Sequence, residues 1–162
     1  MTTETNSEYQ KVLKFAEQGN HQQALNGINK FLDKEPENPE MLNDAGAILF
    51  CLDRFDEAIE HFEKAKRING DSAEILWNLS EAYLCVGKAE QANELFDDME
   101  KKGVLSADVL NRAANVFLNE GKSAGALKML NRSLQISPEQ EIIKKMIEVV
   151  SSQLDKQDTN QN

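Results

Sequence analysis

The hydrophobic residues of this chain fall into pairs of short stripes, in which they recur at spacings of three and four. Residues 39–72 illustrate one pair. Its first stripe comprises Met41, Leu42, Ala45, Leu49 and Leu52, and its second comprises Phe55, Ala58, Ile59, Phe62 and Ala65. Side chains at these spacings share one face of a helix, so each stripe predicts an amphipathic helix. Only Asp53 and Arg54 separate the stripes, which makes the two helices antiparallel neighbours.

The pair of stripes returns every 34 residues. Alanine marks the second helix each time, at Ala24, Ala58, Ala92 and Ala126. Five positions before these alanines stand Gly19, Asp53, Gly87 and Gly121 in turn. Glycine at this point can adopt the left-handed backbone that ends a helix. A shared period without insertions predicts four stacked helical hairpins, which we number as repeats one to four: residues 5–38, 39–72, 73–106 and 107–140.

Small residues mark the predicted contact between the two helices of a repeat. The first helices of repeats two to four carry Gly46, Ser80 and Ala114 at one in-phase site, and the period-setting alanines occupy the partner site. Two helices approach most closely where their side chains are small. Larger in-phase residues are expected to fill the space above and below this contact, namely Leu49, Tyr83, Phe117, Phe62, Phe96 and Leu130.

Both ends of the array depart from the pattern. Repeat one carries Glu8, Lys11 and Val12 where later repeats have apolar or small residues, so we interpret it as an N-terminal cap, with a displaced first helix as the alternative. Residues 141–154 predict one more helix that caps repeat four. Its apolar face is broader than one neighbour needs, which leaves contact with a second copy open. Residues 1–4 and 155–162 lack apolar anchors and are expected to be disordered.

The net charge of −10 over 162 residues narrows the choice of partners. An acidic surface repels phosphate backbones and anionic lipid, so nucleic acid and membrane are not expected. The charge either keeps the protein soluble and monodisperse or, as the alternative, suits a basic partner. The N-terminus lacks a signal-peptide pattern and no window approaches 18 apolar residues, which predicts a cytoplasmic protein. Cys51 and Cys85 are then expected to be reduced and to pack as small buried hydrophobic residues.

No residue pattern indicates catalysis. His21 and His61 lie on second helices of different repeats and have no acidic or thiol partner at ligand spacing. The two cysteines alone make a poor metal site. The chain contains no glycine-rich phosphate loop and no nucleophile motif. We therefore expect neither an enzyme, nor a cofactor, nor a bound metal.

The repeated pattern resembles the tetratricopeptide repeat. The residues that illustrate the resemblance best are Leu76, Leu79, Ser80, Tyr83, Gly87, Ala92 and Phe96. The resemblance implies an all-α, right-handed superhelical solenoid of antiparallel helix pairs, in which first helices line a concave groove. It also implies binding to a segment of another protein. Some members hold a carboxylate with basic groove residues, but those residues are absent here, so we reject that mode.

The packing stripes predict which residues face the groove. A step of one residue turns a helix face by about 100°, so residues one step after the core stripe point away from the packed partner. These residues are Tyr9, Leu13, Ala16, Asn43, Ala47, Phe50, Trp77, Glu81, Leu84, Asn111, Asn115 and Leu118, with Asn78, Arg112 and Asn119 beside them. Asparagine side chains can pair with a peptide backbone. Trp77 is expected either as an exposed anchor or packed between neighbouring first helices.

These observations predict a non-catalytic scaffold that binds an extended or helical peptide segment in the groove. One alternative is a structural protein that associates with itself through the C-terminal helix. A second alternative is a small acidic secretion chaperone, because such chaperones are built from the same repeats, although they usually carry three.

Overall fold

The computed structural model describes residues 3–159, with side-chain environments for residues 6–154, and over this range it contains nine helices and no strand. The helices are α1 (Thr3–Glu17), α2 (His21–Leu32), α3 (Pro39–Cys51), α4 (Phe55–Ile68), α5 (Ala73–Cys85), α6 (Ala89–Lys101), α7 (Ala107–Asn119), α8 (Ser123–Ile136) and α9 (Glu141–Thr159). The predicted all-α class is therefore confirmed. The chain divides into two compact units, Met1–Met99 and Glu100–Asn162, which are described separately.

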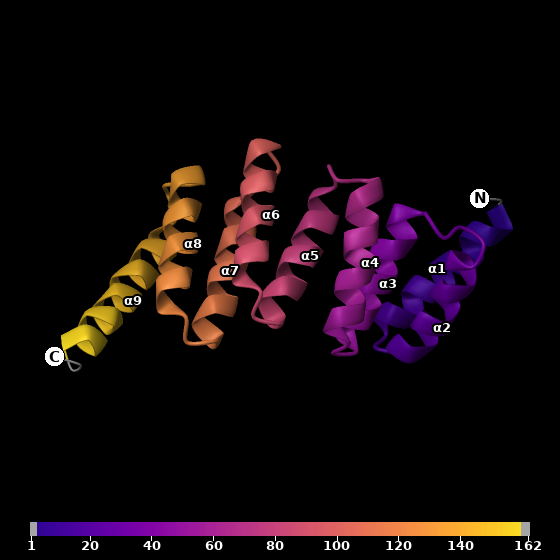
Figure 1. Cartoon of the computed structure of the whole chain (residues 1–162), viewed down its shortest axis with the longest axis horizontal. Coiled ribbons are helices and arrows are strands. Elements are labelled where there is room, and N and C mark those ends of the chain that lie inside the picture. Colours follow the sequence, from indigo (N-terminus) through magenta and orange to yellow (C-terminus); the bar gives the residue numbers. More distant parts are fainter. Residues whose placement is uncertain (1–2, 160–162) are drawn as a thin grey trace. The chain divides into compact units, whose positions relative to one another are not determined.

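In the first compact unit, successive helices pack as hairpins and hairpins pack side by side. Helix α1 contacts α2, α2 contacts α3, α3 contacts α4, and α4 contacts α5 (Figure 1). The period-setting alanines Ala24, Ala58 and Ala92 are fully buried, and so are the in-phase residues Phe62 and Phe96. Burial of these small and large positions together is the packing that the 34-residue period predicts.

The contact between α3 and α4 depends on the absence of a side chain at Gly46. A Cβ atom built at Gly46 would lie 2.6 Å from Cε1 and 2.7 Å from Cδ1 of Phe62. In repeat one the small and the large residue of this helix contact are exchanged between the two helices. It has Val12 on the first helix, and the small residue is Gly27 on the second helix, where an added Cβ would lie 2.6 Å from Val12 Cγ2. Helix α1 is thus docked on α2 rather than displaced.

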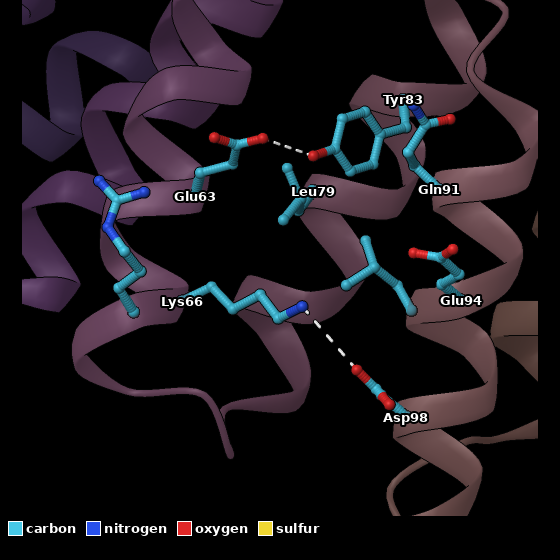
Figure 2. Close-up of a pocket in the computed structure, with 9 residues that line it drawn as sticks. Glu63, Lys66, Leu79, Tyr83, Gln91, Glu94 and Asp98 are labelled. Carbon is cyan, nitrogen blue, oxygen red and sulfur yellow. Dashed lines mark hydrogen bonds and ion pairs between the residues drawn. The ribbon is translucent and has the colours of Figure 1, made fainter.

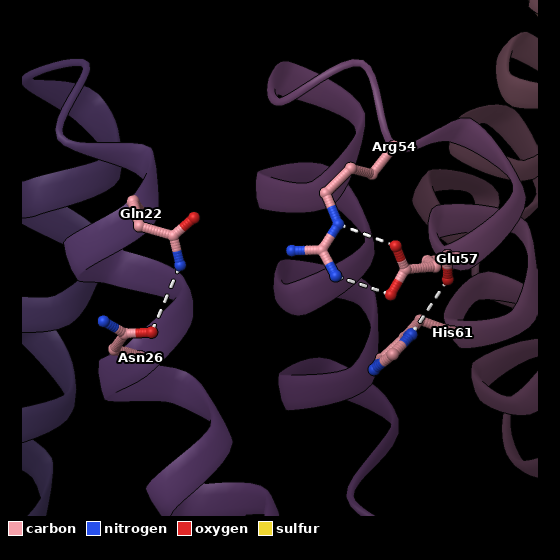
Figure 3. Close-up of polar contacts among 5 residues, drawn as sticks. All are labelled: Gln22, Asn26, Arg54, Glu57 and His61. Atoms are coloured by element: carbon pink, nitrogen blue, oxygen red, sulfur yellow. Dashed lines mark hydrogen bonds and ion pairs between the residues drawn. The ribbon is translucent and has the colours of Figure 1, made fainter.

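The turn between the two helices of a repeat requires a left-handed residue. Gly19 and Gly87 have φ angles of 79° and 75°, and Asp53, which replaces glycine in repeat two, has a φ of 57°. Asp53 therefore adopts the glycine conformation despite its Cβ atom. The following helix begins with a local ion pair, in which the Arg54 guanidinium donates two hydrogen bonds to Glu57 at 2.6 and 2.7 Å (Figure 3).

The second compact unit consists of the α7–α8 hairpin and of α9, which packs on α8. Ile143 and Val150 are the buried residues of α9, whereas Ile142 and Val149 are 75% and 57% exposed. The helix begins at the predicted residue and continues to Thr159, five residues beyond the expected end at Leu154. Residues 1–2 and 160–162 of the predicted disordered ends lie outside the described residues.

The predicted burial of the two cysteines is wrong. Cys51 and Cys85 are the last residues of α3 and α5, and both are exposed. The last residue of each helix lies beyond the packed contact between helices, so both cysteine side chains face solvent. No disulfide joins the two cysteines.

Candidate peptide-binding face

The groove-facing side of the first compact unit is formed by the first helices α1, α3 and α5. Side-chain hydrogen bonds connect the three helices in order. The Tyr9 hydroxyl on α1 donates to Asp44 on α3. Asn43 on α3 donates from Nδ2 to Glu74 Oε1 on α5 at 3.0 Å, and Asn78 on α5 donates from Nδ2 to Asn43 Oδ1 at 3.0 Å. We call this surface the inner face.

One part of the inner face is an open, acidic hollow of about 390 Å³ between α1, α3 and α5. Three carboxylates line it, from Glu40, Asp44 and Glu74, and its lining contains no basic side chain. Burial raises the pKa of Asp44, and the charges of Glu74 and Glu40 raise it further, although the hydrogen bond from Tyr9 opposes this shift. Burial and the hydrogen bond to Asp44 likewise raise the pKa of Tyr9. The negative charge here is therefore poorly compensated within the protein.

An apolar hollow of about 300 Å³ adjoins the acidic one between α1 and α3. Leu13, Ala16, Ala47 and Ile48 provide most of its apolar lining. The two hollows share Leu13 and Asp44, so they form one continuous surface with an apolar end and an acidic end.

The first groove-facing position of each repeat is more enclosed than the sequence predicts. Tyr9, Asn43 and Trp77 occupy this position in repeats one to three, and each is 5–7% exposed. Of the two alternatives for Trp77, the exposed anchor is wrong, because the side chain is buried and its ring stacks on Phe96 of α6 with centroids 6.5 Å apart. A large side chain at this position of a first helix reaches the helices packed beside it, as Trp77 of α5 reaches Phe96 of α6. Trp77 therefore belongs to the core.

Positions one turn further along each first helix are more accessible. Ala47, Asn78 and Glu81 are half-buried, and Ala47 lines the apolar hollow. Phe50 is half-buried against Phe55, with ring centroids 5.2 Å apart. Leu84 is only 1% exposed, so its predicted place on the groove surface is wrong. The accessible part of the predicted set thus combines polar side chains with apolar ones such as Leu13 and Phe50.

In the second compact unit, the predicted residues lie on α7. Arg112, Asn115 and Asn119 are exposed. Asn111 is half-buried and donates from Nδ2 to Gln140 Oε1 at 2.8 Å, while its Oδ1 atom is buried without a hydrogen-bond partner. Asn111 therefore joins α7 to the segment before α9, much as Asn43 joins α3 to α5.

Sequence reasoning missed the acidic residues that open the first helices. Glu40, Glu74 and Asp108 are 34 residues apart, and all three are exposed. The recurrence of an acidic residue every 34 positions in the sequence could have indicated them. Acidic residues in a first turn also stabilise the helix N-terminus, which offers a local reason for their presence. That reason does not extend to Asp44, which lies beyond the first turn of α3 and whose side chain is partly buried.

The second helices carry a contrasting hollow of about 340 Å³, lined by residues of α4, α5 and α6. Figure 2 shows a hydrogen bond and an ion pair that cross this hollow. The Tyr83 hydroxyl donates to Glu63, and Lys66 Nζ lies 3.8 Å from Asp98 Oδ2. Burial and the neighbouring Glu63 raise the pKa of Tyr83. This hollow therefore contains basic side chains, Lys66 and Arg67, beside its carboxylates.

Neither histidine lies in a metal-binding group. His61 is on α4, where its Nδ1 atom lies 2.9 Å from the carbonyl oxygen of Glu57 (Figure 3). The Nδ1 atom of His21 is buried and has no hydrogen-bond partner. Within residues 6–154, whose side chains the structure describes, no three His, Cys, Asp or Glu side chains are placed to hold a metal ion. Over residues 3–159, no helix is both long enough and apolar enough to cross a membrane.

Comparison with known proteins identifies the repeat. Residues 37–98 match a family model described as the tetratricopeptide repeat. A search of curated proteins finds no match to this chain. Among solved structures, a crystal structure of MamA is similar with a TM-score of 0.73 and 21% identity, covering 92% of this chain and 82% of that one.

Two further structures share the fold. A MamA fragment (residue 41 to the end) from Desulfovibrio magneticus RS-1 has a TM-score of 0.76 and 13% identity, covering 98% of this chain and 90% of that one. Pseudomonas aeruginosa PilF has a TM-score of 0.71 and 18% identity, covering 93% of this chain and 69% of that one. At these identities the similarity shows the fold alone.

Proposed function

We propose that this chain, a tetratricopeptide-repeat protein, is a non-catalytic scaffold that binds a peptide segment of a partner protein along its first helices. Proteins with this fold are protein-interaction scaffolds, which supports a protein-binding role here. The observation that carries the proposal is the pair of adjoining hollows on the inner face. They place apolar surface beside carboxylates whose hollow has no basic side chain in its lining, whereas the hollow on the second-helix side is lined by Lys66 and Arg67 as well as by carboxylates.

The test is to block the inner face and measure capture of partners. Ala47 lines the apolar hollow, and its replacement by arginine places a long side chain there. The wild-type chain and the Ala47→Arg variant are each used to capture proteins from extracts of the source organism, and the captured proteins are quantified by mass spectrometry. We expect the variant to lose the partners that the wild-type chain captures. The matched control is Ala124→Arg, the same substitution at an exposed position of the second helix α8. Equal capture by the wild type and Ala47→Arg would refute the proposal.

A second candidate function is self-association through α9. The observation that favours it is the exposure of Ile142 and Val149, which lie seven residues apart on one side of that helix. The variant Ile142→Asp/Val149→Asp would then be monomeric at concentrations where the wild type is a dimer. A wild-type chain that sediments as a monomer at micromolar concentration would exclude this candidate.

A further inference from the structure

Three side-chain donors of the inner face already donate hydrogen bonds within the protein. The Tyr9 hydroxyl is spent on Asp44, and the Asn43 amide donates to Glu74. The Asn78 amide is spent in turn on Asn43. These donors are therefore directed along the protein surface, to the Asp44 and Glu74 carboxylates and to the amide oxygen of Asn43.

A group that enters this hollow should therefore be a hydrogen-bond donor with positive charge. Glu40, Asp44 and Glu74 line the hollow without any lysine or arginine of this chain. Burial and mutual repulsion raise the pKa of Asp44, so a cation placed here would relieve an existing cost. The second-helix hollow differs, because Lys66 already lies near Asp98 there.

The carboxylates of this hollow do not form a metal-binding group. No three metal-binding side chains converge within the part of the chain that the structure describes. Separated acceptors are better matched by arginine, whose planar guanidinium presents five N–H donors, than by the compact ammonium group of lysine. Nucleic acid and anionic lipid are excluded by their own charge.

The neighbouring apolar hollow favours a ligand that also carries an apolar side chain. Because Leu13 and Asp44 line both hollows, an apolar group and a basic group must enter next to each other. Residues two apart on an extended segment, or three to four apart on a helix, bring two side chains this close. A peptide can satisfy both hollows at once, and the buried apolar group contributes affinity in addition to the charge.

Building on the proposed function, we infer that the inner face of α1, α3 and α5 recognises a peptide segment in which an arginine lies beside an apolar residue. The basic side chain enters the hollow lined by Asp44 and Glu74, and the apolar side chain lies over Ala47. The charge complementarity selects the segment, and the apolar contact sets its position along the face.

A random dodecamer library displayed on phage and selected on the full chain provides the probe. Enriched sequences are synthesised with a fluorescent label, and their dissociation constants are measured by anisotropy. We expect an arginine beside an apolar residue in most enriched peptides. Asp44→Asn and Glu74→Gln keep an oxygen that accepts the internal hydrogen bond but remove the charge. Each should weaken binding about tenfold.

The control for general electrostatics is Glu60→Gln, which removes the same charge from an exposed position on the second helix α4. It should change the dissociation constant less than about twofold, because exposed charges at a distance are screened by salt. Fluorescence of the buried Trp77 during urea unfolding verifies that each variant is folded.

The outcomes separate this inference from the proposed function. If Ala47→Arg abolishes binding but the double variant Asp44→Asn/Glu74→Gln binds as tightly as Glu60→Gln, the groove function stands and the basic specificity is refuted. Enriched peptides without basic residues lead to the same conclusion. If no enriched peptide is sensitive to Ala47→Arg, both proposals fail.

Discussion

Replacing Gly46 by alanine tests the packing between α3 and α4. On propensity alone this substitution should stabilise the helix, because glycine in a helix interior costs about 1 kcal/mol relative to alanine. The structure predicts the opposite sign. The new Cβ would lie 2.6 and 2.7 Å from two ring atoms of Phe62, about 1 Å closer than an ordinary carbon–carbon contact.

The magnitude follows from how little the ring can move. Phe62 is 1% exposed, so it cannot turn into solvent. Overpacking of a well-filled core costs about 1–3 kcal/mol, which exceeds the propensity gain. We therefore expect Gly46→Ala to lower the free energy of unfolding by about 1 kcal/mol, the difference between the two effects.

Repeat four suggests the compensating change. Its in-phase residues are Ala114 and Leu130, both fully buried, where repeat two has Gly46 and Phe62. The double variant Gly46→Ala/Phe62→Leu should thus lose less stability than the sum of its single variants. A coupling energy of about 1 kcal/mol or more is expected for two residues in direct contact.

The assay is urea unfolding followed by circular dichroism and by fluorescence of Trp77. Repeat arrays need not unfold in one step, so the two signals are fitted separately. Trp77 lies in the first compact unit together with Gly46 and therefore reports on that unit. A Gly46→Ala variant as stable as the wild type, or single variants whose effects simply add, would refute the packing argument.

Three further predictions concern other positions. Asp53→Gly should raise the free energy of unfolding by about 0.5–1 kcal/mol, measured by thermal and urea unfolding, because it relieves a Cβ atom held at a φ of 57°; an unchanged or lower stability would contradict this. Ala92→Leu should lower stability by about 1–3 kcal/mol in the same assays, because Ala92 is fully buried where two helices approach; a neutral effect would show room at that contact. Asp44→Asn should stabilise the protein near neutral pH, where the carboxylate is ionised. Because the folded-state pKa of Asp44 is raised, the cost of its charge is present above that pKa and disappears as the pH falls below the unfolded value of about 3.9. The stability difference between Asp44→Asn and wild type, from urea titrations at several pH values, should therefore shrink on acidification, and a constant difference would refute the assignment.

The order and type of the helices could be predicted from the sequence because they follow from local rules. Apolar spacings of three and four define an amphipathic helix wherever they occur, and the 34-residue period places every hairpin in the same register. Burial of Ala58 and Phe62 follows directly from that register. Even Asp53 could be recognised as occupying a glycine site, although its left-handed conformation became visible only in the structure.

The accessible residues of the inner face could be predicted only in part. Ala47 and Glu81 follow the core stripe by one residue, and both are half-buried rather than buried. Trp77 and Leu84 satisfy the same rule and are nevertheless buried. The rule describes the direction in which a side chain leaves its own helix, but not how close the neighbouring helices come or how far a large ring reaches across them.

The sequence by itself thus determined the helices, their pairing and their repeat, because these depend on residues close together in the chain. The tertiary structure decided which side chains of α1, α3 and α5 meet. Tyr9 reaches Asp44 and Asn43 reaches Glu74 across 35 and 31 residues of sequence. Such contacts depend on the distance and angle between whole hairpins, and no local pattern of residues contains that information.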